Sequence, residues 1–395
     1  MKKDVFYNLL AVSLPVAALQ LVVLPAMNSC MALDAYGLAI ALMAVLNVFP
    51  VAVGNSLCNV RQLMEGEYRD RGLSGDFLLL NVCFAAVSNA IVVIASFSMG
   101  ANLGECAGLV VASLFMQFYN YGIVFYRLTV DFKRVFFTGL ALSAGYIVGY
   151  SVFSISLYWP VVLIVGYLIP SIYIIARSNI LSDGFCKTKL FDRTTRIQVS
   201  LLGSLLLANA ANYGDRLILF PLLGASAVSV YYISSLVGKI LVMMISPMST
   251  VLLTYLAKSA ELDKGKTKRL LRISLLSGAF FWIAACVASP AILGFLYPQE
   301  ATAAVEYVPF AAAVAVFQAA CSVLNPTLLR FFDVKWQVIS NALSLTLMVG
   351  FGFVLSHAFS LLGFCIACLI ASVAKFVFVA ILVLKGERDA EYRVL

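Results

Sequence analysis

Residues 359–384 read FSLLGFCIACLIASVAKFVFVAILVL, and this stretch decides the fold class. Lys375 is its only charged residue. An α-helix needs about 20 predominantly apolar residues to cross a bilayer. Helices are favoured there because hydrocarbon offers no partner to unpaired backbone groups. We therefore predict that residues 359–384 form a transmembrane helix.

The same pattern recurs along the whole chain. Hydrophobic residues make up 63% of the 395 and charged residues 12%, a balance far from that of soluble domains. The apolar runs predict spans near 6–29, 36–59, 77–99, 106–126, 135–156, 160–176, 197–222, 227–257, 273–296, 304–328, 337–356 and 359–384. The predicted fold class is an all-α integral membrane protein of about 12 transmembrane helices.

Basic residues set the predicted orientation. If Lys2 and Lys3 lie in the cytoplasm, every predicted cytoplasmic loop collects Lys and Arg, whereas the predicted outer loops contain neither. The cytoplasmic set includes Arg61, Arg69, Arg71, Arg127, Arg134, Arg177, Lys258, Lys385, Arg388 and Arg393. By the positive-inside rule both termini are predicted to be cytoplasmic, as in a multi-pass protein of the bacterial cytoplasmic membrane. The net charge of +8 then reflects topology and attraction to anionic headgroups, and nucleic-acid binding is not predicted.

The chain divides into two predicted lobes of six spans each, residues 1–190 and 191–395. Both lobes would begin on the cytoplasmic side, as parallel repeats do in transporters with two lobes around a central pathway. Weak self-similarity supports the repeat, because Pro25 and Tyr36 match Pro221 and Tyr232 at one common offset.

Charges inside the membrane are costly, so they mark candidate functional residues. Asp215, Arg216, Lys239 and Lys375 lie deep in predicted spans, all in the second lobe. Three cations against one acid leave a positive excess, which hydrocarbon disfavours without water or an anionic ligand. We predict that Arg216, Lys239 and Lys375 bind a pyrophosphate group through charge-assisted contacts, while Asp215 balances charge or couples an ion. A structural alternative stays open, in which Asp215 pairs with Lys239 and the other two cations reach the interfaces.

Uncharged polar residues extend this candidate pathway. Two spans of the second lobe carry them at helical spacing, and the first lobe is rich in amides. The residues predicted to contact a saccharide or line the pathway are Gln20, Asn55, Asn59, Asn209, Asn212 and Tyr232. Membrane amides also commonly join helices, and that alternative stays open.

Two stretches resemble a known family. The first begins at Tyr36 and ends with GNSLCNVR at 54–61, and the second is DRLILFPLLG at 215–224, continuing to Tyr232 and Lys239. Together with the order of spans, they resemble the polysaccharide flippases (O-antigen and capsule type) of the multidrug, oligosaccharidyl-lipid and polysaccharide (MOP) exporter superfamily.

This resemblance implies alternating access between two six-helix lobes and transfer of a polyprenyl pyrophosphate-linked oligosaccharide to the outer leaflet, for surface polysaccharide synthesis. It implies a monomer without a cofactor, in contact with membrane lipids and with polysaccharide polymerase and glycosyltransferases.

Competing functions are weaker on the residues. An ion-coupled multidrug (MATE-like) exporter of the same superfamily is the main alternative, although Asp215 is the only deep acid available to bind a cation. A scramblase would not require the buried cation excess. No enzyme motif is found, and the single histidine, His357, lies near an outer helix end. The pair Cys365 and Cys368 lies within an apolar span and is predicted to pack there without binding a metal.

Overall fold

The computed structural model describes residues 2–180, 184–257 and 264–385, and in these ranges the chain is helical without strands. Ten helical segments of this part are long and apolar enough to cross a membrane. The predicted all-α membrane fold is therefore confirmed. Two segments, Phe191–Ile240 and Lys335–Leu384, are 50 residues long, and each contains a break in the helix. The count of about 12 crossings and the cytoplasmic termini stay predictions, and the predicted loop cation Lys258 and residues 386–395 lie outside the described residues.

The chain forms two compact units, Met1–Asn209 and Ala210–Leu395. The division predicted from the sequence lies earlier, at residue 190. Unit 1 contains α1 (Lys2–Ala17), the π-helix η1 (Ala18–Val23), α2 (Leu24–Asn28), α3 (Leu33–Val48), α4 (Pro50–Asp70), α5 (Asp76–Ser98), α6 (Leu103–Gly122), α7 (Val124–Leu128), α8 (Phe132–Ser156), α9 (Pro160–Arg177) and the first part of α10 (Phe191–Ala257).

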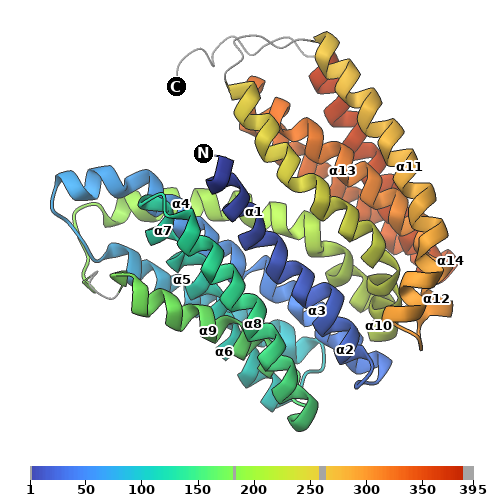
Figure 1. Ribbon diagram of the computed structural model, residues 1–395, viewed down its shortest axis with the longest axis horizontal. Helices are drawn as coiled ribbons and strands as arrows, with labels where there is room; N and C mark the ends of the chain where they lie inside the picture. Colours follow the sequence, from blue (N-terminus) through green and yellow to red (C-terminus); the bar gives the residue numbers. More distant parts are fainter. Residues whose placement is uncertain (1, 181–183, 258–263, 386–395) are drawn as a thin grey trace. The chain divides into compact units, whose positions relative to one another are not determined.

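Small residues let the helices of unit 1 approach closely. α8 packs along α9 and α1, as Figure 1 shows. A Cβ added to Gly145 would lie 2.6 Å from the carbonyl oxygen of Gly166 on α9, and one added to Gly149 would lie 2.9 Å from Val162. The Gly145-x-x-x-Gly149 motif therefore serves backbone contact between two membrane helices.

Helix α4 is longer than its apolar run predicts. The predicted span ends at residue 59, but the helix continues to Asp70, so Arg61 lies inside it and is only 6% exposed. Its guanidinium lies 4.3 Å from the ring of Phe125 and 5.1 Å from that of Phe77, and it donates a hydrogen bond of 2.6 Å to Tyr121. Aromatic faces and a phenol thus replace water around a cation that the sequence places in a loop.

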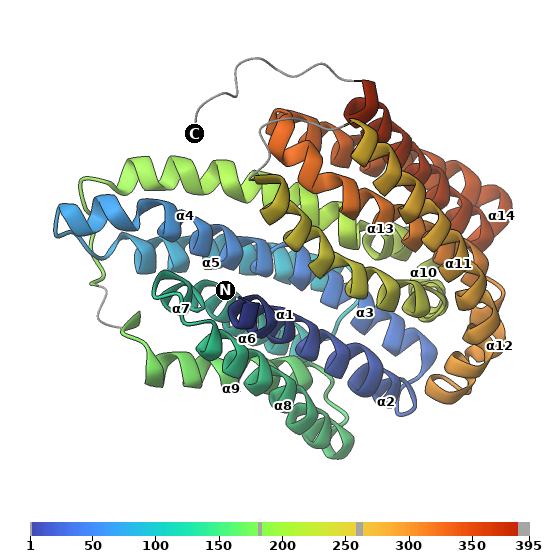
Figure 2. The same cartoon turned by 45° about the horizontal axis from the view of Figure 1, so that its top comes forward.

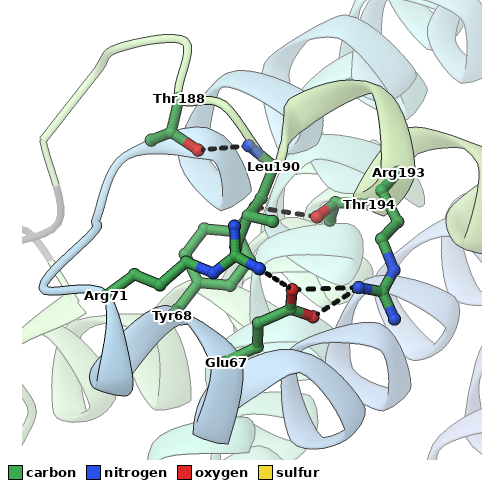
Figure 3. Close-up of polar contacts among 7 residues, drawn as sticks. All are labelled: Glu67, Tyr68, Arg71, Thr188, Leu190, Arg193 and Thr194. Atoms are coloured by element: carbon green, nitrogen blue, oxygen red, sulfur yellow. Dashed lines mark hydrogen bonds and ion pairs between the residues drawn. The ribbon is translucent and has the colours of Figure 1, made fainter.

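The segment that leads into α10 is bound to the α4–α5 turn (Figure 3). Asp76 is fully buried and accepts hydrogen bonds from the Thr188 backbone N–H at 2.7 Å, from the Thr188 hydroxyl, and from Tyr68 at 2.6 Å. The Tyr68 and Thr194 hydroxyls lie 2.7 Å apart. Glu67 pairs with Arg193 as well as with Arg71 on its own helix. These contacts make the start of α10 part of unit 1; in Figure 2 it runs beside α4.

Unit 2 contains the rest of α10, α11 (Lys264–Leu296), α12 (Ala301–Val305), α13 (Val308–Phe331) and α14 (Val334–Lys385). Helix α10 breaks at Gly224, where φ is 83°, and α14 breaks at Phe359 and Ser360. Glycine adopts such a positive φ without a steric penalty. The two arms of α10 on either side of Gly224 supply the candidate site.

The arms of α10 pack on α14 and α13. Tyr231 stacks edge-on against Phe364 at 5.5 Å, and a Cβ added to Gly238 would lie 2.7 Å from that of Ala315. Helix α13 also packs between α11 and α14 (Figure 1). This packing fixes the face of α10 that carries Tyr232 and Lys239.

Candidate functional site

A buried cation and a half-buried cation of unit 2 share one aromatic ring. The Cζ atom of Arg216 lies 5.0 Å from the ring centroid of Tyr232, and the Nζ atom of Lys239 lies 4.3 Å from the same centroid. Arg216 is 7% exposed and Tyr232 is 1% exposed. Arg216 comes from the arm of α10 before Gly224 and Lys239 from the arm after it. The break at Gly224 therefore lets one helix element supply both cations.

Local helix geometry directs Lys239 toward this ring. Helical side chains lean toward the N-terminus, so Lys239 reaches back over Ser235 and Tyr232. Its Nζ donates a hydrogen bond of 2.6 Å to the Ser235 hydroxyl, which itself donates to the Tyr232 carbonyl at 2.8 Å. The polar stripe that spacing predicts on this helix is therefore a connected set of contacts, and Ser235 is a member that the predicted site omitted.

Asp215 compensates only part of this positive charge. Its Oδ1 accepts the Arg216 backbone N–H at 2.9 Å and lies 3.9 Å from the Arg216 side-chain Nε. That Nε has no hydrogen-bond partner among the described residues. Within the same part of the chain, Asp215 and Lys239 form no ion pair, whereas the positions of the other two cations relative to the membrane interfaces stay a prediction. Two cations and one carboxylate leave the cluster of Asp215, Arg216, Tyr232 and Lys239 positive, and we call it the cation pair site.

Lys375 makes no contact with the cation pair site among the described residues. It is half-buried on α14 and donates a hydrogen bond of 2.7 Å to Asn341 on the other arm of that helix. The next residue, Phe376, packs on Phe317 of α13 at 5.5 Å, in an apolar cluster that extends to Phe332. Gly238, beside Lys239, instead faces Ala315. The structure thus brings together two of the three predicted cations.

Comparison with solved structures shows that the fold of this chain is a known one. No protein-family profile matches the chain, and no curated sequence matches it. The lipid II flippase MurJ in its inward closed conformation matches with a TM-score of 0.77 at 12% identity, over 95% of this chain and 86% of that one. An inward-facing multidrug resistance MATE family transporter of the MOP superfamily matches with 0.62 at 15% identity, over 95% and 98%. A MOP superfamily transporter from Pyrococcus furiosus matches with 0.57 at 15% identity, over 96% and 94%.

The chain shares its fold with these solved transporters. Sequence identities of 12% to 15% support a shared fold and do not establish a shared cargo or activity. Because flippases and multidrug transporters share this MOP fold, the cargo must be argued from the side chains.

The other predicted residues are divided between the units of this MOP fold. In unit 1, Asn55 and Asn59 lie one turn apart on α4, both half-buried, and Asn209 donates a hydrogen bond of 2.9 Å to the Asn47 carbonyl. Gln20 lies in the π-helix η1, and its buried Oε1 has no partner among the described residues. These four therefore lie in unit 1, whereas the residues of the cation pair site belong to unit 2.

Asn212 is exposed in unit 2, and Tyr232 is buried against cations. The saccharide contact predicted for Tyr232 stays a prediction. Arg61 in unit 1 is a buried cation that the sequence did not mark, although Tyr121 and Phe125, one helical turn apart, were a signal for its aromatic surroundings.

Proposed function

We propose that this chain transports a lipid-linked anionic amphiphile across the membrane, specifically a polyprenyl pyrophosphate-linked oligosaccharide in surface polysaccharide synthesis at a bacterial cytoplasmic membrane. Alternating access of a MOP fold supplies the movement. The proposal treats the chain as a monomeric transporter, with no enzymatic step and no cofactor. Membrane lipids, a polysaccharide polymerase and glycosyltransferases are its proposed partners.

The observation that carries the proposal is the unbalanced charge of the cation pair site. Arg216 and Lys239 lie on one buried ring, and among the described residues Asp215 is the carboxylate that pairs with Arg216. A buried cation excess is stabilised by an anionic ligand, and a guanidinium binds phosphate oxygens in a forked geometry. In this account Arg216 and Lys239 hold the pyrophosphate, and Lys375 is a separate cation beside Asn341.

The amides of unit 1 support a cargo with a sugar portion. Gln20 has a buried carbonyl oxygen without a partner in the part of the chain that the structure describes, and Asn55 and Asn59 are half-buried on one face of α4. Amide groups offer both donors and acceptors to saccharide hydroxyls. We propose that Gln20, Asn55, Asn59 and Asn209 line the saccharide pathway.

Ion-coupled export of cationic drugs is the second candidate, because MATE transporters share the fold and Asp215 is a partly buried acid. The charge of the site disfavours it. A cationic cargo beside Arg216 and Lys239 would add repulsion at short range.

A complementation assay tests the proposal. Cells lacking their polysaccharide flippase receive the wild-type chain, Arg216→Gln, Lys239→Met or the matched control Lys335→Gln, which removes an exposed cation. We expect the control to restore surface polysaccharide and both site variants to fail at normal protein level. Full restoration by both site variants would refute the pyrophosphate role, whereas drug resistance without polysaccharide export would support the second candidate.

A further inference from the structure

The Tyr232 ring lies against two cations at once. Arg216 and Lys239 contact it at 5.0 and 4.3 Å, and their charged centres are therefore at most about 9 Å apart. The second arm of α10 holds the ring in place, and only 1% of Tyr232 is exposed. An aromatic face carries negative electrostatic potential but no net charge.

Each cation has a second support that fixes its direction. Arg216 also lies 5.5 Å from the ring of Tyr213, three residues earlier on the same arm. Lys239 is held by the Ser235 hydroxyl at 2.6 Å. Both cations contact the Tyr232 ring, which therefore couples their positions.

The Tyr232 ring does not satisfy all the hydrogen-bond donors of the two cations. A π-face attracts a cation without accepting conventional hydrogen bonds in the number that an ammonium or guanidinium can donate. The buried Arg216 Nε accordingly has no partner among the described residues. An oxygen of an anionic ligand would satisfy this donor.

We infer that Tyr232 is a positioning residue that holds Arg216 and Lys239 together for an anion carrying two linked phosphate groups. The inference rests on the proposed function and adds a reason why the site would prefer a diphosphate to a single phosphate group. A diphosphate engages both cations at once, whereas one phosphate group has fewer oxygens to share between them. Without the ring, each cation moves independently and the advantage of the diphosphate is reduced.

Binding of inorganic pyrophosphate and inorganic phosphate to the purified full-length chain in detergent tests the inference. The variants are Tyr232→Phe, which keeps the aromatic face, and Tyr232→Leu and Tyr232→Met, which remove it. We expect wild type and Tyr232→Phe to prefer pyrophosphate, and the two non-aromatic variants to lose about tenfold of that preference. Two non-aromatic side chains of different shape keep the test valid if one of them fails to fold.

The ratio of the two affinities separates positioning from general loss of structure, because partial unfolding lowers both affinities together. Unchanged preference in Tyr232→Leu and Tyr232→Met, or equal loss in Tyr232→Phe, would overturn the role of the ring while leaving the proposed function intact. Absence of pyrophosphate binding in the wild type would overturn both.

Discussion

Tyr68 on α4 and Thr194 on α10 lie with their hydroxyls 2.7 Å apart, and both belong to unit 1. Tyr68 also donates to the fully buried carboxylate of Asp76, which accepts from Thr188 as well. The loop that enters α10 is therefore held by hydrogen bonds to the α4–α5 turn.

Substitution of Asp76 should release this loop. Asp76→Ala leaves the Tyr68 hydroxyl and the Thr188 backbone N–H without their acceptor, and we expect it to destabilise unit 1 by about 2 kcal/mol or more. Thermal unfolding in detergent and the rate of proteolysis within residues 184–190 measure the effect. Glu67→Gln is the control, because its pairs with Arg71 and Arg193 are partly exposed and contribute about 1 kcal/mol or less. Equal effects of the two substitutions would contradict this account.

Replacement of Arg61 by lysine should destabilise the protein. A lysine lacks the planar guanidinium that contacts Phe77 and Phe125 while donating to Tyr121. We expect Arg61→Lys to lower the melting temperature of the purified protein, whereas Arg71→Lys at an exposed pair leaves it unchanged. An unchanged melting temperature in Arg61→Lys would show that charge alone suffices at this position.

The close contact between α8 and α9 at Gly145 predicts that a larger side chain there destabilises the protein, and Gly203 offers a matched control. In Gly145→Ala the new Cβ would lie 2.6 Å from the Gly166 carbonyl oxygen, so α8 and α9 must separate, at a cost of about 1–3 kcal/mol. Gly203 lies on α10, and a Cβ added there would have no neighbouring atom within 4 Å. We therefore expect Gly203→Ala to leave the stability unchanged or to raise it slightly. Thermal unfolding of the two variants checks this, and equal stability of both would contradict the packing of α8 on α9.

Lys375 should be less important for pyrophosphate binding than Arg216 or Lys239. It donates to Asn341, and it has no contact with the Tyr232 ring in the described structure. We expect Lys375→Met to change the affinity of the purified chain for inorganic pyrophosphate less than threefold, and Lys239→Met to reduce it about tenfold or more. A larger loss in Lys375→Met would restore the three-cation site predicted from the sequence.

Apolar runs predicted the membrane fold, because every segment that crosses the hydrocarbon must be apolar and must satisfy its backbone hydrogen bonds internally. Helix α4 extends beyond the predicted span for a physical reason. Residues 60–70 are polar but favour helix, so the helix continues past the first charge, and Arg61 becomes buried among aromatic side chains supplied by α5 and α7. Hydropathy detects the membrane boundary and does not detect tertiary burial beyond it.

The candidate site was predictable in part. The cost of buried charge identified Arg216 and Lys239 directly. Their shared ring was not predictable, because it depends on the break at Gly224 and on the direction of side chains along the second arm of α10. The partner of Lys375 is Asn341, 34 residues away, which only tertiary packing can bring into contact.

Transport by the reconstituted protein tests the central claim most directly. Proteoliposomes are loaded in one leaflet with a fluorescent polyprenyl pyrophosphate-linked sugar, and its appearance in the other leaflet is followed for wild type and for the Arg216→Gln/Lys239→Met double variant. We predict movement of the lipid by the wild type, and loss of that movement in the folded double variant. Equal movement by both proteins, or uphill transport of a cationic dye by a wild type that leaves the lipid in place, would contradict the account.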